Sequence, residues 1–539
     1  MRVRKPENDS QTPALQISHP RDFRRKEIQT MSFDNPALQF DEQRLAKREI
    51  LLERGIPLYP PSFERTHTIT EIRTEFDACT HDPSEKQVTT AGRIYIVRDH
   101  GKTFFCDLRD ECGGIQLYIR KDSLPEGKFD VFKVGVERGD IIGVTGRAFR
   151  TKVGEITLWV DDYELLTKAL CPLPEKFHGL TNLEKRYRQR YLDLIVNEES
   201  RQTFRTRSRI LSLLRSLLTT KEFLEFETPT LQPIYGGANA RPFTTYHNFL
   251  EQKLYMRIAP ELYLKRLVVG GFEKVFELAK NFRNEDIDTS HNPEFSMVEI
   301  YQAYADYKDM MRLTEELISG IIKEITGGYE VAYEGNQINF APPWNALPMD
   351  EAVKTIGGVD IFSYDLDALK EKGRSLKIEG IEAVRNHREA LVLFFEALVE
   401  EKLIQPTFIL DFPIENSPLA KVHREKEGFV ERFELFIAGM ELANGFSELN
   451  DPLDQLQRFE AQEEKRRLGD EEAQMHDYDF VNALGYGMPP TGGVGIGIDR
   501  LVMLTTSNTS IKEVILFPSM RRESIGESEE EGTPGEDTQ

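Results

Sequence analysis

Cysteine is scarce in this sequence, and long apolar runs are missing. Only four cysteines occur in 539 residues, none in a Cys-x-x-Cys pair, and no histidine cluster has the spacing of zinc ligands. This excludes a disulfide framework and a zinc module, and it favours the reduced thiols of a cytoplasmic protein. No apolar run approaches the roughly 20 residues that span a bilayer, and no apolar segment follows the first basic residues as in a secretory signal. We therefore expect a cytoplasmic protein with no membrane partner.

Positive charge is also in deficit, since 69 Lys and Arg residues face 91 Asp and Glu residues, a formal net charge of −22. This balance argues against a general binder of polyanions. The charge is uneven, however, because residues 176–190 are basic and overlap the basic and aromatic stretch Lys185–Tyr191. Such a stretch either meets nucleic acid or forms a solvated helix face whose tyrosines pack inward. An apolar fraction of 39% is enough for sizeable cores, which excludes a wholly disordered chain.

The composition divides the chain into segments. The polar, proline-containing residues 1–33 predict a disordered extension, and residues 521–539 predict an acidic disordered tail. Met31 opens a more regular stretch, which suggests the hypothesis of a natural start at this residue. Between the two ends we expect a helical segment over 34–75, a small β domain over 76–168, a linker over 169–200 and a large domain over 201–520.

Residues 76–168 alternate short β-rich runs with turn signals. The runs are Ile94–Ile96, Phe104–Leu108, Ile115–Ile119, Ile141–Val144 and Ile156–Val160. Five short strands in about 80 residues predict a small closed β-barrel of the OB-fold type, an architecture that binds oligonucleotides. A purely structural barrel is the alternative.

Residues 201–520 predict an α+β domain. From Arg201 a helix carries apolar residues at the i, i+3, i+4, i+7, i+8 spacing of a buried face. These residues are Ile210, Leu213, Leu214, Leu217 and Leu218. The strands and helices that follow lack the regular βαβ rhythm of a doubly wound sheet, which favours a largely antiparallel sheet flanked by helices. Residues 365–403 are helix-rich and lie between motif-bearing stretches, so we interpret them as an insertion.

Two of three unusual stretches precede the insertion. In the first, Pro229 closes a strand-like pattern, and the following Gly236–Gly237 pair implies a close approach of the backbone. In the second, Arg283 and Glu285 lie two apart, on one face of an expected strand. They form either an exposed salt bridge, or a site where the arginine binds phosphate and the glutamate meets an amine or ring nitrogen. A polar hairpin with Phe295 follows, whose ring is suited to stacking on a base.

The third stretch, Gly492–Arg500, is rich in glycine. It is not a dinucleotide fingerprint, because Arg500 occupies the place of the last glycine and no Walker lysine follows. Glycines at alternate strand positions clear one face instead, so that a flat ligand can lie against the backbone. Arg500 would then hold phosphate from the start of the next helix.

In this order the three stretches resemble the three signature motifs of the class II aminoacyl-tRNA synthetases. Further segments, together with the upstream barrel, are similar to the lysyl-tRNA synthetase family. These segments are Arg257–Arg266, Asn444–Asn450 and Gly487–Pro490. The resemblance runs from about residue 36 to about residue 520. Two residues depart from the family pattern: Gly485 stands where a glutamate is expected, and Tyr478 interrupts an expected run of acids.

The resemblance implies two steps. ATP and L-lysine form lysyl-adenylate, and the lysyl group then moves to the 3′ end of tRNA(Lys). Such catalysis needs positioning and charge neutralisation more than a covalent nucleophile. By resemblance Arg283 and Arg500 are the catalytic residues, at the α-phosphate and the γ-phosphate respectively. Phe295 is implied to stack on adenine, with Glu285 or the nearby loop at the adenine amino group, and His291 belongs to the same ATP site.

The same resemblance implies a magnesium cofactor and a lysine pocket. Glu434 and Glu441, on an expected strand and turn, look like the family's Mg²⁺ ligands. Plain surface solubility is the alternative for any one acid in so acidic a chain. The implied lysine-binding residues are Gly237, Glu261, Tyr301, Asn444 and Glu448, with Glu261 at the α-amino group and Glu448 at the ε-ammonium. A buried carboxylate at position 448 would also repel aspartate.

The barrel is implied to read the anticodon, with an exposed ring stacking on a base. The implied residues are Arg98, Phe105, Gln116 and Glu155. A core position for Phe105 is the alternative, since Phe104 and Phe105 face opposite sides of a strand. The first motif and the helix over 201–221 imply a homodimer. Two other functions stay open: a lysine-adenylating enzyme that modifies a translation factor, whose relatives lack the barrel, and a catalytically inactive tRNA-binding paralogue.

Overall fold

The computed structural model describes residues 38–174, 180–469, 472 and 474–521. Contacts divide the chain into two compact units, residues 1–178 and 179–539. The extension expected over 1–33 lies outside the described residues, and so does the expected acidic tail from residue 522 onward. Among the helices of the described residues, none is long and apolar enough to cross a membrane.

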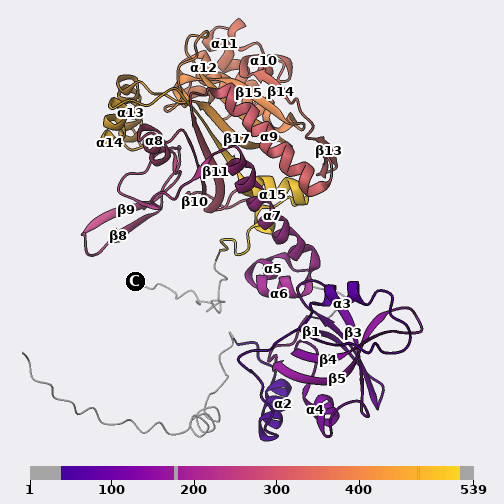
Figure 1. Ribbon diagram of the computed structural model, residues 1–539. Helices are drawn as coiled ribbons and strands as arrows, with labels where there is room; N and C mark the ends of the chain where they lie inside the picture. Colours follow the sequence, from indigo (N-terminus) through magenta and orange to yellow (C-terminus); the bar gives the residue numbers. More distant parts are fainter. Residues whose placement is uncertain (1–37, 175–179, 470–471, 473, 522–539) are drawn as a thin grey trace, which may run out of the picture. The chain divides into compact units, whose positions relative to one another are not determined.

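Within residues 38–174, five strands close into a barrel in the order β1-β2-β3-β5-β4 (Figure 1). The strands are β1 (Gln87–Asp99), β2 (Thr103–Arg109), β3 (Gly114–Arg120), β4 (Ile141–Arg150) and β5 (Ile156–Thr167). The helices of this part are α2 (Glu42–Glu53), α3 (Ile69–Glu75) and α4 (Lys128–Gly135). The predicted barrel is confirmed, and α4, between β3 and β4, is an element that the strand pattern did not reveal.

Alternation along the strands decides which side chains fill the barrel. Buried and half-buried residues alternate strictly along β2 and β3. Phe104 is only 4% exposed and packs inside, with its ring centroid 5.1 Å from that of Phe132. Phe105 faces the other way, where its ring lies 4.9 Å from that of Tyr118 between centroids. The alternative that placed Phe105 in the core is therefore wrong.

The described residues of the second unit contain an eight-stranded sheet in the order β14-β15-β16-β17-β18-β11-β10-β6. Its strands are β6 (Leu224–Glu225), β10 (Lys274–Phe282), β11 (Glu294–Ala303), β14 (Asn345–Pro348), β15 (Thr407–Pro413), β16 (Phe429–Ile437), β17 (Met440–Ser447) and β18 (Thr491–Gly497). Parallel pairing occurs at the two edges, between β6 and β10 and between β14 and β15, while the inner pairs are antiparallel. The predicted largely antiparallel sheet is confirmed.

Three helices share a hydrophobic core with this sheet: α7 (Glu198–Thr220), α9 (Tyr307–Thr326) and α15 (Ile498–Thr506) (Figure 1). The fully buried apolar residues of α7 belong to the predicted stripe; they are Ile210, Leu214 and Leu218. The helices therefore anchor the strands that carry the motif residues, and α15 follows β18 directly.

Other elements surround this core. Helices α8 (Glu261–Val269), α13 (Pro452–Arg467) and α14 (Tyr478–Gly485) contribute to a second core, and α10 (Met349–Thr355), α11 (Leu366–Ser375) and α12 (His387–Leu398) to a third. The short strands are β7 (Leu231–Gln232), β8 (Thr244–His247), β9 (Gln252–Met256), β12 (Glu330–Tyr333) and β13 (Asn336–Asn339), and the last helix is α16 (Ile511–Val514). The helix-rich character expected for 365–403 is present in α11 and α12.

The stretch expected as the end of a linker is helical. Helices α5 (Leu183–Arg188) and α6 (Arg190–Val196) belong to the second unit. Arg190 is fully buried, and its Nη1 and Nη2 atoms donate to Asp193 Oδ2 and to the Lys512 carbonyl, each at 2.7 Å. A guanidinium has enough donors to satisfy several buried oxygens at once, so a basic segment packs inside here. This differs from the linker expected over 169–200. It also differs from the solvated face with inward tyrosines, because Arg190 is buried and Tyr191 is 61% exposed.

Candidate active site

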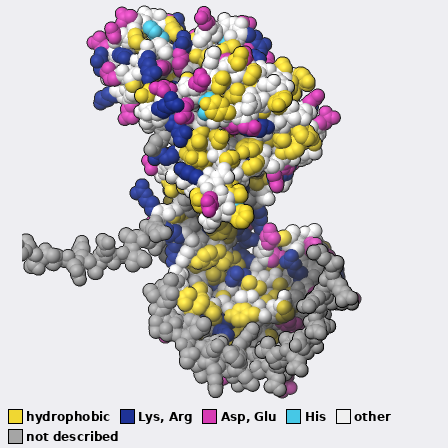
Figure 2. Space-filling view, turned by 90° about the vertical axis from the view of Figure 1, so that its left-hand side faces the viewer, with side chains coloured by type: hydrophobic (Ala, Val, Ile, Leu, Met, Phe, Trp, Pro, Cys, Tyr) yellow, Lys and Arg dark blue, Asp and Glu magenta, His cyan; other side chains and the backbone are white. Residues whose placement is uncertain are grey.

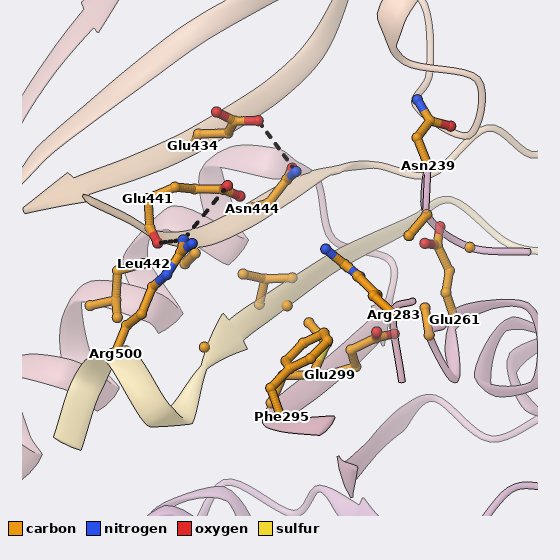
Figure 3. Close-up of a pocket in the computed structure, with 18 of the residues that line it drawn as sticks. Asn239, Glu261, Arg283, Phe295, Glu299, Glu434, Glu441, Leu442, Asn444 and Arg500 are labelled. Atoms are coloured by element: carbon orange, nitrogen blue, oxygen red, sulfur yellow. Dashed lines mark hydrogen bonds and ion pairs between the residues drawn. The ribbon is translucent and has the colours of Figure 1, made fainter. Parts of the chain in front are cut away.

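A cavity of about 420 Å³ opens in the second unit, over the strands that carry the motifs (Figure 3). It is lined by most of the site residues expected in this unit: Gly237, Glu261, Arg283, Glu285, His291, Phe295, Tyr301, Glu434, Glu441, Asn444 and Arg500. The exception among the expected residues is Glu448. Segments that are far apart in the sequence thus converge on one hollow.

The pairing of β18 with β11 and β17 builds the floor of the cavity. Gly495 pairs with Glu299 on one side and with Asn444 on the other. Gly495 and Gly497 line the cavity, as expected for glycines that clear one face of a strand. Gly493 has a different role, because a Cβ atom built there would lie 2.1 Å from Glu448 Oε1. This glycine makes room for a protein carboxylate.

Arg283 enters the cavity from the loop that follows β10, which ends at Phe282. The expectation that Arg283 and Glu285 lie on a strand is therefore wrong, because the ladder with β11 stops one residue earlier. The Arg283 guanidinium carbon lies 4.9 Å from the centre of the Phe295 ring. Burial lowers the pKa of Arg283, although Glu285 and Glu441 oppose this. A guanidinium remains charged under these conditions and can meet a phosphate.

Arg500 reaches the same space from the first turn of α15 (Figure 3). Its Nη1 donates to the carbonyl oxygen of Glu441 and lies 4.0 Å from Glu441 Oε2, while its Nη2 lies 3.3 Å from His291 Nε2. The two arginines approach the cavity from different elements. Their planar donor forks suit a polyphosphate that extends between them.

Two carboxylates face each other across the β16–β17 hairpin, where Glu434 pairs with Asn444 and Phe436 with Glu441. Burial and the nearby Glu441 raise the pKa of Glu434 to about 8. Arg432 Nη2 donates to Glu434 Oε1 and lowers this pKa, but it does not offset the effects of burial and Glu441. Hard carboxylate oxygens are the donors that Mg²⁺ prefers. No group of three or more His, Cys, Asp or Glu side chains that could hold a metal ion occurs among the described residues.

The other end of the cavity is acidic and almost closed to solvent. Glu261 is 6% exposed, Glu299 is 4% exposed and Tyr301 is 3% exposed. The Tyr301 hydroxyl donates to Glu299 Oε2 at 2.9 Å. Burial and the neighbouring Glu261 raise the pKa of Glu299 to about 8. An ammonium group would relieve this accumulation of buried acids.

Glu299 was missed by the sequence analysis. A signal existed, since Glu299 lies two residues before Tyr301 and therefore on the same face of β11. Lys265 was missed as well: it is fully buried on α8, donates to Glu261 Oε1 at 2.6 Å and also contacts Glu448 Oε2. Glu448 is buried beside Tyr301 and Gly493 but does not line the cavity, so its role at the ε-ammonium stays a prediction.

The residues expected at the anticodon lie on the outer surface of the barrel. Phe105 on β2 pairs with Arg98 on β1 and with Tyr118 on β3. Gln116, two residues before Tyr118 and on the same face, accepts a hydrogen bond from Thr157 Oγ1 at 3.2 Å. A further expected residue, Glu155, is exposed immediately before β5. Together these strands present an outward aromatic and polar patch, suited to a single-stranded base.

The departures from the family pattern do not lie in the cavity. A Cβ atom built at Gly485 would have no atom within 4 Å, so a larger residue would have space there. Tyr478 is exposed and stacks on His476, with ring centroids 3.7 Å apart. Neither residue lines the site.

Comparison with known proteins agrees with this geometry. Residues 182–521 match the family of class II tRNA synthetases (D, K and N), and residues 88–166 match the OB-fold nucleic acid binding domain. The chain is 78% identical over 498 residues to the lysine–tRNA ligase of Methanospirillum hungatei, which covers 92% of this chain and 99% of that protein. It is 63% identical to the lysine–tRNA ligase of Methanoculleus marisnigri, over 92% of this chain and 98% of that protein. The corresponding protein of Carboxydothermus hydrogenoformans is 53% identical, over 89% and 97% of the two chains. On the evidence of the paired motifs, the barrel and these relatives, the chain belongs to the lysine–tRNA ligases of the class II tRNA synthetase family.

Proposed function

We propose that this chain activates L-lysine with ATP and transfers the lysyl group to the 3′ end of tRNA(Lys). The observation that carries this proposal is the composition of one cavity, which is lined by arginines, among them Arg283 and Arg500, and by the buried acids Glu261 and Glu299. The arginines suit a triphosphate, and the acids suit a substrate with two ammonium groups.

In the first step a carboxylate oxygen of lysine attacks the α-phosphorus of ATP. The bond from that phosphorus to the bridging oxygen breaks, and pyrophosphate leaves with the electron pair. In the second step the 3′-terminal ribose hydroxyl attacks the carbonyl carbon of the adenylate, loses its proton, and AMP leaves. Both steps gain from fixed positive charge near the phosphates, and neither needs a covalent intermediate on the protein.

ATP would lie in the cavity with its triphosphate between Arg283 and Arg500. Arg283 would hold the α-phosphate and Arg500 the γ-phosphate, and Phe295 would stack on adenine. Glu285 and His291 complete this set. The contact between Arg500 and His291 supports their grouping at one end.

Magnesium would be held by Glu434 and Glu441. The ion supplies neutralisation of phosphate charge when bound. Burial and Glu441 raise the pKa of Glu434 even though Arg432 lowers it, and this supports a cation site at the hairpin. Asn444 Nδ2 lies 3.4 Å from Glu434 Oε1 and links this site to the amino-acid end of the cavity.

Lysine would occupy the acidic end. Glu261 would take the α-ammonium, beside the backbone of Gly237, and Glu448 would take the ε-ammonium. Tyr301 and Asn444 would be hydrogen-bonding neighbours. The burial of Glu448, which is only 1% exposed, supports selection of a cationic side chain over the anionic one of aspartate.

The barrel would bind the anticodon of tRNA(Lys). Phe105 would stack on a base and Gln116 would hydrogen-bond to it, with Arg98 and Glu155 in support. The outward orientation of Phe105 supports this assignment. The closed barrel and the intact cavity residues argue against the two alternative functions, modification of a translation factor and an inactive paralogue.

A homodimer in the cytoplasm would be the working form. Exposed apolar side chains near the first motif support a dimer contact there: Leu224, Leu231, Tyr246, Phe249 and Leu250. Hydrophobic side chains also gather on the face of the second unit that Figure 2 turns to the viewer. The free cysteines Cys79, Cys106, Cys112 and Cys171 suit a reducing compartment.

The test is exchange of pyrophosphate into ATP with each of the twenty amino acids, with and without tRNA. Of the twenty amino acids, we expect lysine alone to support exchange, and we expect this exchange to occur in the absence of tRNA. Glu448→Gln should reduce lysine-dependent exchange far more than it reduces thermal stability, whereas Glu324→Gln, at an exposed position of α9, serves as the matched control. Unchanged kinetics in Glu448→Gln would remove this residue from the site, and an absence of lysine-dependent exchange would refute the proposed function.

A further inference from the structure

A fully buried lysine lies next to the acidic end of the cavity. Lys265 is 0% exposed and is not among the residues that line the cavity. Its ammonium donates to Glu261 Oε1 at 2.6 Å, one helical turn earlier on α8. The same ammonium contacts Glu448 Oε2, from the segment after β17. One protein ammonium thus joins the two carboxylates to which the α- and ε-ammonium groups of the substrate are assigned.

Two aromatic rings also lie near the Lys265 ammonium. Lys265 Nζ lies 5.3 Å from the centre of the Phe446 ring and 6.0 Å from that of Phe480. Rings at this distance favour a cation and exclude water. The Lys265 ammonium is therefore buried between two carboxylates and two aromatic rings.

In Glu261 and in Glu448, the carboxylate oxygen that does not contact Lys265 points toward a glycine. A Cβ atom built at Gly237 would lie 3.5 Å from Glu261 Oε2, so this oxygen faces the glycine loop of the cavity. A Cβ atom built at Gly493 would lie 2.1 Å from Glu448 Oε1, so that oxygen lies against Gly493, the neighbour of the cavity-lining Val494 on β18. Among the described residues, Glu448 Oε1 has no hydrogen-bond partner. A buried carboxylate oxygen without a donor is costly, and a ligand ammonium would supply one.

The charge count points the same way. Glu261, Glu299 and Glu448 are all buried at this end, and Lys265 neutralises the equivalent of one of them. An excess of buried acid remains at this end, and an ammonium group of the substrate would offset it.

We propose that Lys265 is a positioning residue for the amino-acid substrate: it holds one oxygen of Glu261 and one of Glu448, so that their other oxygens meet the two ammonium groups of lysine at a fixed separation. This inference rests on the proposed function and adds that the site selects its substrate by the length of the side chain. We expect ornithine, which is one methylene shorter, to reach only one of the two oxygens. Lys265 thereby contributes to specificity without touching the substrate.

The experiment compares L-lysine with L-ornithine in pyrophosphate exchange for the full-length wild type and Lys265→Met. Methionine keeps the approximate volume and removes the charge. We expect KM for lysine to rise about tenfold or more, since a misplaced binding group costs this much, with a change in kcat of about threefold or less, the mark of lost ground-state binding. The preference for lysine over ornithine in kcat/KM should fall about fivefold or more.

A matched control is available in the barrel. Lys168 is also buried, with its Nζ 2.6 Å from Glu137 Oε1 and 2.9 Å from Asp140 Oδ2. Lys168→Met removes an equivalent internal ion pair away from the cavity, so it should lower thermal stability and leave KM for lysine and the ornithine preference unchanged. If Lys265→Met does not fold, Lys265→Gln, which keeps a donor, is measured in the same way.

The outcomes separate the two proposals. No lysine-dependent exchange by the wild type defeats the proposed function itself. A wild type that uses ornithine as well as lysine defeats the fixed separation, whatever the variants do. Folded Lys265 variants with unchanged KM and preference assign Lys265 to stability alone and overturn the inference.

Discussion

The guanidinium carbon of Arg283 lies 4.9 Å from the centre of the Phe295 ring. The backbone enforces this contact, because the Arg283 N–H donates to the Pro293 carbonyl at 2.9 Å and Phe295 pairs with Asn281 in the β10–β11 ladder. Both side chains therefore lie at the end of the β10–β11 ladder, with the Arg283 guanidinium over the Phe295 ring. This places a fixed cation beside the ring that is proposed to bind adenine.

Arg283→Lys tests whether the forked donor is needed. Lysine keeps the charge but cannot form two parallel hydrogen bonds to a phosphate. We expect kcat for pyrophosphate exchange to fall about 100-fold or more, the usual loss for a donor to a developing charge, with little change in thermal stability. A loss below tenfold would mean that Arg283 binds no phosphate in the transition state. Arg312→Lys, on the exposed side of α9, is the control.

Gly493→Ala tests the space that Glu448 requires. The new Cβ atom would lie 2.1 Å from Glu448 Oε1 and 2.6 Å from Tyr301 Cε1, so both side chains must move. We expect a destabilisation of about 1–3 kcal/mol and a rise of KM for lysine of about tenfold or more. Thermal unfolding and exchange kinetics measure the two effects. Gly485→Ala, where no atom lies within 4 Å of the new Cβ, should match the wild type in both.

Lysine binding should depend on pH through Glu299. Burial and Glu261 raise the pKa of Glu299 to about 8, so the carboxyl is mostly neutral at pH 7 and becomes negative above pH 8. The ionised form attracts a cation, so KM for lysine should fall as the pH rises from about 6.5 to about 8.5, by about fivefold. Exchange rates across this range measure the effect. Glu299→Gln cannot ionise and should give a flatter profile with a higher KM; an identical slope in both proteins would contradict this assignment.

Phe105→Ala tests whether the barrel binds tRNA independently of amino-acid activation in the cavity. Loss of one stacking ring should lower kcat/KM for tRNA(Lys) about tenfold, because base stacking on an aromatic ring contributes about 1–3 kcal/mol. Pyrophosphate exchange without tRNA should be unchanged. Phe104→Ala removes a core ring from the same strand, and it should lower the stability of the barrel by about 3–5 kcal/mol. Equal charging of a tRNA with an exchanged anticodon would also speak against this role for the barrel.

Much of the architecture follows from local pattern. Five β-rich runs with turns between them predicted the closed barrel, because alternation and turn chemistry act within a few residues. The apolar stripe of α7 and the glycines of β18 were recognisable for the same reason. Motif residues such as Arg500 and Glu441 could be named in advance, although the motifs showed nothing of the contact between them.

Other features escaped the sequence. Arg283 lies in a loop, since the length of the β10–β11 ladder depends on the partner strand and not on β10 alone. The helices of residues 183–196 pack where a linker was expected, because the carbonyl groups that satisfy Arg190 lie more than 300 residues away. Long-range partners of this kind leave no periodic trace in the chain.

The sequence by itself determined the barrel strands, the stripe of α7, the family and the chemical character of the site, because strand alternation, helix periodicity and motif residues are local properties. The tertiary structure alone decided which oxygen of each carboxylate is free. That choice depends on where one buried ammonium, on α8, meets the glutamate that follows β17, and such a meeting exists only after the chain has folded.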